Sequence, residues 1–226
     1  MQTKSFVLVA ALAIGMATGV SAATVGLWST GVCSGLNNGV GGCTPGALLG
    51  FGVQDLNYTF SGFSTTNRTE SATGIGTYIP DATGASRWLT PGTTAAGLFP
   101  TGPYTVTTTF SLTGFNASTL NLFLDIAADN IVVAALNGTT ILSCNTGGAA
   151  CFSAFTSNHS IAAGGIAVAG LNTLSFTVTN QDNNSPTALR VQVQGNADVA
   201  AVPEPATWGL LGAGLVGFGL LRRRLS

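Results

Sequence analysis

The sequence predicts an all-β fold, a sandwich of two sheets, and three observations carry this prediction. Apolar and polar residues alternate along several short segments, an Asn-Gly pair separates two of them, and no amphipathic helical pattern occurs between residues 24 and 200. Alternation with a period of two buries one side of a strand and leaves the other in water. Many short strands divided by Gly, Asn and Pro turns are typical of sandwiches.

The expected strands follow one another along the middle of the chain. Residues 104–110 are rich in threonine and other strand formers. Residues 130–136 and 139–143 flank Asn137-Gly138, the strongest short signal for a β-hairpin. Three further strands are expected to turn Leu122, Leu124, Leu174, Phe176, Leu189 and Val191 toward the core. No internal boundary is visible, so residues 23–200 are expected to form one domain.

The first 22 residues have the pattern of a signal peptide. Lys4 is followed by an apolar stretch from Phe6 to Ala17, and Val20-Ser21-Ala22 supplies the small residues of a cleavage site. A buried N-terminal helix is the alternative, but the apolar stretch has no amphipathic period. We therefore expect a signal helix that the export machinery recognises and that is removed after Ala22.

Charge is scarce in this chain. Only 7% of the residues are charged, against about 25% in an ordinary soluble domain. Residues 23–202 contain seven acidic and three basic residues, which gives a net charge of −4. This region has no basic patch for phosphates, so nucleic acid is excluded as a partner.

The last part of the sequence, residues 202–226, carries a membrane pattern. Val202-Pro203-Glu204-Pro205 precedes an apolar run over residues 206–221, and Arg222, Arg223 and Arg224 follow it. Sixteen helical residues span about 24 Å, slightly less than the roughly 30 Å of a hydrocarbon core. The arginines favour the cytoplasmic side, which places the main domain outside. We expect a transmembrane helix here.

The order of Pro-Glu-Pro, short apolar helix and arginine cluster resembles the PEP-CTERM sorting signal. This resemblance implies that an exosortase-type processing enzyme recognises the tail and cuts near Pro203-Glu204-Pro205. The chain would then be held in the inner membrane only transiently, before release to the outer surface or the extracellular matrix. A permanent anchor is the alternative.

A second resemblance covers the middle of the chain. The segments Leu136-Asn137-Gly138 and Asn172-Thr173-Leu174-Ser175-Phe176-Thr177-Val178-Thr179-Asn180 are similar to those of galactose-binding-like jelly rolls. Such domains occur as carbohydrate-binding and accessory modules beside glycosidases. The resemblance implies a jelly-roll sandwich and carries little information about a ligand.

Four cysteines form two local pairs in the sequence, Cys33 with Cys43 and Cys144 with Cys151. Export favours disulfides, although four cysteines allow three connectivities. We expect local pairing because each pair brackets a Gly-rich stretch. A metal site at the cysteines is disfavoured, since no C-x-x-C spacing occurs and His159 is the single histidine.

The candidate ligand residues lie near strand ends. Asp129 and Asn130 offer the oxygen ligands that Ca²⁺ takes, so a structural calcium is the one cofactor considered; turn formation is the alternative reason for an Asx cluster. Asn180 and Arg190 have groups that bind sugar hydroxyls, with Arg190 expected on the solvent side of its strand. Trp88 is a candidate platform for a sugar ring or, alternatively, a core aromatic.

The sequence makes no positive case for an enzyme. His159 stands without a recognisable catalytic context, and Asp125 with Asp129 is the one conceivable carboxylate pair. We expect a non-enzymatic, exported protein with a structural, adhesive or weak carbohydrate-binding role. Exopolysaccharide is the partner that such a role implies. The alternative is a secreted glycan-active hydrolase or an accessory module of one.

Overall fold

The structure is a computed structural model that describes residues 21–35, 43–72, 78–81, 85–92, 97–145, 150–201, 212, 214–215 and 218–223. Most of the regular structure is β. The strands are β1 (Ala22–Thr24), β2 (Thr59–Ser61), β3 (Asn67–Glu70), β4 (Trp88–Pro91), β5 (Gly102–Ser111), β6 (Asn121–Asp129), β7 (Ile131–Leu136), β8 (Thr139–Cys144), β9 (Thr156–Ala162), β10 (Leu171–Asn180) and β11 (Ala188–Asp198). Two short helical segments, η3 (Ala117–Thr119) and α1 (Ala150–Ser153), accompany them.

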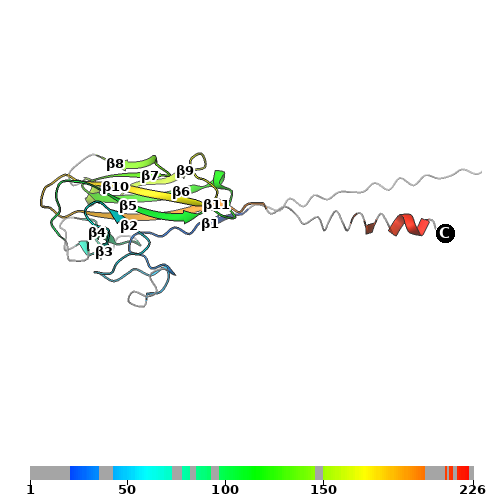
Figure 1. Cartoon of the computed structure of the whole chain (residues 1–226), viewed down its shortest axis with the longest axis horizontal. Helices are drawn as coiled ribbons and strands as arrows, with labels where there is room; N and C mark the ends of the chain where they lie inside the picture. Colours follow the sequence, from blue (N-terminus) through cyan, green and yellow to red (C-terminus); the bar gives the residue numbers. More distant parts are fainter. Residues whose placement is uncertain are drawn as a thin grey trace, which may run out of the picture.

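These strands form two antiparallel sheets stacked face to face (Figure 1). The first sheet has the order β3-β4-β11-β6-β9, with β1 also paired to β11. The second sheet has the order β2-β5-β10-β7-β8. The predicted two-sheet sandwich is confirmed, and its architecture is consistent with a jelly roll. The galactose-binding-like type of jelly roll stays a prediction.

The core lies between the sheets, where the alternating segments predicted it. Leu122, Leu174, Phe176 and Val191 each have no exposed surface. The same is true of Leu124 and Leu189. Alternate residues of β6, β10 and β11 therefore meet in one layer of apolar side chains.

The predicted hairpin is also present. β7 and β8 pair from Leu136 and Thr139 outward, so Asn137 and Gly138 form a two-residue turn. Their φ angles are +48° and +84°. Positive φ at both central residues is what a type I′ turn requires, and Asn-Gly adopts it at the lowest cost.

A second, smaller core lies on the outer face of the first sheet and covers only half of it. Apolar side chains from residues far apart in the chain build it: Ala72, Tyr78, Ile79, Trp88, Ala127 and Ala188, with Phe152 and Phe155 packed against them. We call the part of the face beneath them, which carries Ala127 and Asp129 of β6 and Arg190 of β11, the covered half. The open half carries Phe123 and Asp125 of β6 and Gln192 and Gln194 of β11.

Both predicted disulfides are confirmed. Cys33 pairs with Cys43 and Cys144 with Cys151, with Cα atoms 6.0 and 5.8 Å apart. The second bond joins the end of β8 to α1, and the next residue of α1, Phe152, packs onto the second core. This disulfide therefore holds part of the cover in place.

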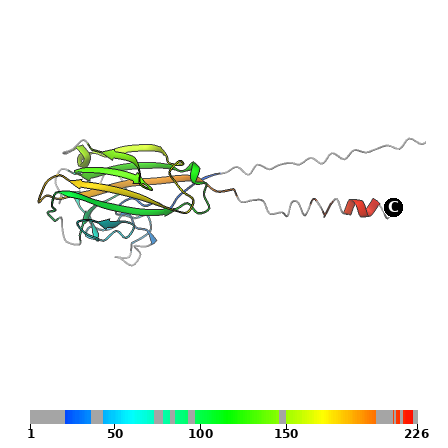
Figure 2. The ribbon, with the colours of Figure 1, turned by 45° about the horizontal axis from the view of Figure 1, so that its top comes forward.

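The two ends of the sandwich domain meet at one place. Ala22 of β1 lies opposite Asp198 of β11, and the amide of Val199 donates to the carbonyl of Ser21 at 3.4 Å. Figures 1 and 2 both place β1 and the end of β11 at the right-hand end of the sandwich. The chain thus enters and leaves the two sheets side by side.

Several predictions concern residues outside those described. Residues 1–20 of the signal peptide predicted over residues 1–22 are undescribed, and the predicted transmembrane helix over 206–221 falls mostly on undescribed residues. Residues 218–223 are helical, with Phe218, Leu220 and Leu221 exposed. Among the described residues, no helix is both long enough and apolar enough to cross a membrane.

Candidate functional site

Trp88 lies inside the second core. It has no exposed surface, its ring centroid is 4.7 Å from that of Tyr78, and its indole Nε1 donates to the carbonyl of Ile79 at 3.1 Å. A buried ring presents no face to a sugar. The core alternative is therefore correct for Trp88, and its interpretation as a sugar platform is wrong.

Arg190 is buried as well, which corrects the expectation of a solvent-facing side chain. Its Nε donates to Ser86 Oγ at 2.9 Å, and its Nη1 donates to the carbonyls of Ile79 and Pro80 at 3.1 Å. The guanidinium carbon lies 5.4 Å from the centroid of the Phe155 ring. Burial lowers the pKa of Arg190 to about 10. The side chain thus holds the cover to the sheet.

Asn180 is used in the same structural way. It is fully buried, and its Nδ2 donates to the carbonyls of Phe99 and Pro100 at 3.3 and 3.1 Å. Its Oδ1 accepts from Ser185 Oγ at 3.0 Å. These bonds tie two loops to the end of β10, so this amide serves the fold at the position where a ligand contact was expected.

Asp129 and Asn130 lie at the end of β6, next to one another and to Asp182. Asp129 is almost buried: Tyr78 donates its hydroxyl to Oδ2, while Oδ1 is buried and has no hydrogen-bond partner within the described residues. Burial raises the pKa of the Asp129 carboxyl, and the hydrogen bond from Tyr78 opposes this. Asn130 donates to Asp182 Oδ2 at 3.3 Å and accepts from the amide of Gln181 at 2.7 Å.

This donor set falls short of a complete cation site. Ca²⁺ takes six to eight oxygen ligands. Asp129 and Asp182 offer carboxylates, but both polar atoms of the Asn130 side chain already have partners. No group of three or more His, Cys, Asp or Glu side chains suited to a metal occurs in the described parts of the chain. Calcium at Asp129 and Asn130 stays a prediction.

The open half of the first sheet carries a pocket that the sequence did not indicate. It has a volume of about 300 Å³, and Ser29 and Ala85 border it. Four outward-facing side chains form its floor as two cross-strand pairs, Asp125 opposite Gln192 and Phe123 opposite Gln194. Directly opposite residues have Cβ atoms about 5 Å apart, so the four side chains form one continuous surface. We call this pocket the sheet-face pocket.

His159 closes one side of the sheet-face pocket. Its Nε2 lies 2.6 Å from Asp125 Oδ1, and its side chain is 62% exposed. The pairing of β6 with β9 shifts between Leu122, opposite Ile161, and Leu124, opposite Asn158, so β9 has one extra residue here. Such a bulge re-aims side chains. Asp125 is therefore a partner of His159 that the sequence did not reveal.

The conceivable carboxylate pair does not converge. Asp125 and Asp129 lie four residues apart on one strand, which corresponds to about 13 Å. Glycosidase carboxyl groups lie roughly 5–9.5 Å apart. Asp125 is in the open half and Asp129 is beneath the cover, so the two carboxylates belong to different environments.

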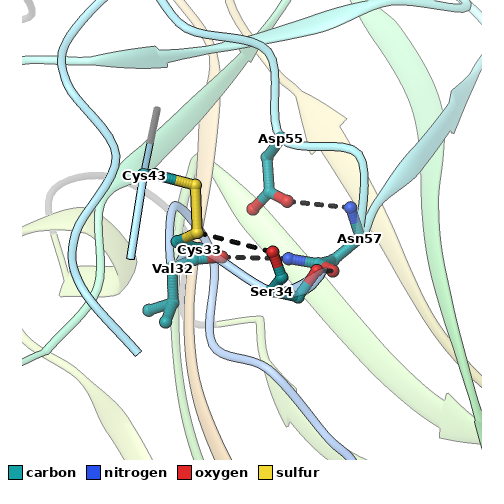
Figure 3. The surroundings of a disulfide bond; sticks show 6 residues. All are labelled: Val32, Cys33, Ser34, Cys43, Asp55 and Asn57. Atoms are coloured by element: carbon teal, nitrogen blue, oxygen red, sulfur yellow. Dashed lines mark hydrogen bonds between the residues drawn. A yellow bond between two sulfur atoms is a disulfide. The ribbon is translucent and has the colours of Figure 1, made fainter. Parts of the chain in front are cut away.

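A second pocket, of about 410 Å³, lies beside the disulfide of Cys33 and Cys43. Trp28, Leu56 and Asn57 line it with threonines of β2 and β5, and none of its lining residues is ionisable. Figure 3 shows the bonds that shape this region: the Asn57 amide donates to Asp55 at 2.9 Å, and Asn57 Nδ2 donates to the carbonyl of Val32 at 2.9 Å.

The tail residues complete the set of predicted sites. Val202, Pro203, Glu204, Pro205 and Arg224 lie outside the described residues, and Arg222 and Arg223 are on the exposed helical segment 218–223. Comparison with known proteins matches residues 201–224 to the PEP-CTERM protein-sorting motif. The motif implies export, sorting to the cell surface with a transient membrane anchor, and processing by an exosortase-type enzyme. No curated protein sequence matches the chain.

Proposed function

From the PEP-CTERM motif at residues 201–224, we propose that the sandwich is the working part of a sorted surface protein with a structural or adhesive role. It binds carbohydrate weakly at the sheet-face pocket and catalyses no reaction. Exopolysaccharide of the cell surface or extracellular matrix is the partner. The signal peptide at residues 1–22 and the cut near Pro203-Glu204-Pro205 are parts of the same proposal.

The single observation that carries this function is the set of side chains in the sheet-face pocket. Two primary amides, Gln192 and Gln194, lie beside one carboxylate, Asp125, and one aromatic ring, Phe123. Amides donate to and accept from hydroxyl groups, a carboxylate accepts from them, and an aromatic ring covers the apolar face of a sugar. The combination fits a neutral, hydroxyl-rich ligand.

The pocket also indicates the size and strength of binding. A volume of about 300 Å³ is at the lower end for ligand pockets. The pocket is shallow, because His159 at its side has 62% of its side chain exposed to water. A short segment of a glycan fits, with weak affinity at each site. Many copies on one surface would then adhere through multivalency.

The absence of catalysis is supported by geometry. A His–Asp pair activates a nucleophile when the histidine also contacts a hydroxyl or thiol. No serine, threonine or cysteine side chain hydrogen bonds to His159 in the described part of the chain. The separation of Asp125 from Asp129 argues against a carboxylate mechanism in the same way.

The test is a titration of the full chain, purified in detergent, with neutral gluco-, galacto- and manno-oligosaccharides. Asp125→Ala and Gln192→Ala should each weaken binding about tenfold, the loss of one to two hydrogen bonds. Thr177→Ala is the matched control, because Thr177 is exposed on the outer face of the second sheet.

Three outcomes contradict the proposal. Loss of binding in Trp28→Ala alone would move the site to the pocket beside the Cys33–Cys43 disulfide. Absence of binding to every glycan tested would mean that the protein is a scaffold without a carbohydrate site. Release of sugar products that stops in Asp125→Asn would favour the glycan-active hydrolase.

A further inference from the structure

The end of the sandwich from which the tail leaves carries little charge, and Asp198 at the end of β11 is its one ionisable residue among those described. Three segments build it next to β1, namely residues 112–120, 163–171 and 199–201, and none of them contains an ionisable residue. The turn at Asn137-Gly138 lies at this end as well, because Leu136 of β7 pairs with Leu174 near the start of β10.

Exposed apolar side chains gather at this end. Val168, Leu171 and Val199 are 50%, 68% and 45% exposed. One loop joins their segments: the amide of Leu112 donates to the carbonyl of Gly170, and Phe115 forms a β-bridge with Val199. We call Val168, Leu171 and Val199 the tail-end surface.

A buried amide holds the tail-end surface in shape. Asn172 has no exposed surface, and its Nδ2 donates to the carbonyls of Val168 and Gly170 at 2.8 and 3.0 Å. Its Oδ1 accepts from the amide of Val168 and from Asn137 Nδ2, both at 2.8 Å. Val168 and Leu171 are therefore presented outward by a braced turn.

The predicted membrane anchor brings a lipid bilayer within reach of this end of the sandwich and not of the opposite end. The apolar run begins at Ala206, five residues after Ala201, and five residues reach at most about 18 Å. β11 has 11 residues and is roughly 35 Å long, so its start at Ala188 lies much farther away. An anchored chain therefore turns the tail-end surface toward the lipid.

We propose that, while the tail is anchored, the tail-end surface rests on the lipid bilayer and inserts Val168 and Leu171 into its interfacial layer. The partner is a lipid surface, recognised by apolar contact without charge pairing. Three apolar side chains bind weakly by themselves, so the contact depends on the anchor, which keeps the surface at high local concentration. Release of the tail would end it.

The test uses the full chain reconstituted in phosphatidylcholine–phosphatidylglycerol vesicles, with or without bromine on the acyl chains. Leu171→Trp adds a reporter to the tail-end surface. Leu98→Trp is the matched control, because Leu98 is 60% exposed and adjoins Phe99, which bridges to Ser185 at the opposite end of the sandwich. The signal is the emission added to that of the unsubstituted chain, which has three tryptophans.

Brominated lipid should quench most of the emission added by Leu171→Trp and almost none of that added by Leu98→Trp. Val168→Trp should behave like Leu171→Trp, and both positions are exposed enough to accept the ring. Equal quenching at positions 98 and 171, or none at 171, would overturn the proposal. Emission at 171 that shifts with protein density but not with bromination would overturn it in favour of contact with a second copy.

Discussion

The covered and open halves of the first sheet belong to the same strands and the same face, yet they do different things. Arg190 and Gln192 are two residues apart on β11 and point to the same side, as Asp125 and Asp129 do on β6. Arg190 and Asp129 lie beneath the second core. Gln192 and Asp125 line the sheet-face pocket.

The difference shows that the face of the sheet on which a strand residue lies and the exposure of that residue to solvent are separate properties. The face follows from the local backbone, because successive side chains of a strand alternate between the two faces. Exposure depends on what packs on that face, here Tyr78, Ile79, Phe152 and Phe155. Under the cover a polar group needs a protein partner, whereas in the open half water or a ligand serves.

The largest effect that tests this comparison is expected at Arg190. Arg190→Ala removes donors to Ser86, Ile79 and Pro80 and leaves a cavity beside Trp88. We expect a loss of about 3–5 kcal/mol in the free energy of unfolding, measured by urea denaturation.

The matched control is Gln192→Ala on the same strand and face. It should change the free energy of unfolding by less than about 0.5 kcal/mol. Similar losses at positions 190 and 192 would show that the distinction between the two halves has no energetic meaning.

The next effect concerns the disulfide that holds the cover. Replacing Cys144 and Cys151 together with serine should cost about 2–3 kcal/mol, because a short closed loop becomes free in the unfolded chain. Loss of order around Phe152 should appear as faster hydrogen exchange at the amide of Ile79, which donates to the Phe152 carbonyl at 2.9 Å. Non-reducing peptide mapping checks the pairing, and a bond between Cys33 and Cys144 would contradict it.

A third effect depends on pH and comes from Asp129. Burial raises the pKa of this carboxyl in the folded chain, so the folded state holds the proton more tightly than the unfolded state. Its contribution to stability is full below the unfolded pKa and falls as pH rises through the folded pKa. Asp129→Asn should remove this fall.

The measurement for Asp129 is a series of urea midpoints at increasing pH from about 3 upward, across the ordinary aspartate range. Gln192→Ala serves as the control and should keep the wild-type slope. A steeper loss of stability with rising pH in Asp129→Asn than in the wild type would mean that the carboxylate form is the favoured one.

The smallest change in stability is expected in the open half. Asp125→Asn should alter the free energy of unfolding by less than about 0.5 kcal/mol, since its partner His159 is largely exposed. Glycan titration should nevertheless show weaker binding. A stability loss above 1 kcal/mol with unchanged binding would make the Asp125–His159 pair a structural contact.

Much of the fold could be predicted because its signals are local. Alternation along β6, β10 and β11 identified the buried side chains, and Asn137-Gly138 identified a hairpin whose backbone angles demand those two residues. β4 gave no such signal, since all four of its residues are buried and none alternates. The position of β4 in the sheet depends on its pairing with β3 and β11, which are separated from it in the sequence.

The site was harder to predict because it depends on register between distant strands. Asp125 and His159 meet only through the irregular pairing of β6 with β9, and neither segment signals a bulge. Trp88 and Arg190 failed as ligand residues for a related reason. The side chains that cover them belong to Ala72, Tyr78, Ile79, Phe152 and Phe155, which lie far from β11 in the sequence, so no pattern near β11 reveals them.

The pairing of β1 with β11 also imposes an order of events during synthesis. Ala23 of β1 pairs with Ala197 of β11, so the first strand of the domain stays without its partner until almost the whole domain has been made. Contacts of such high sequence separation form slowly. The sorting motif follows within a few residues, so closure of the sandwich and presentation of the tail occur at nearly the same stage. A chain arrested before β11 would carry neither the finished domain nor the signal that sorts it.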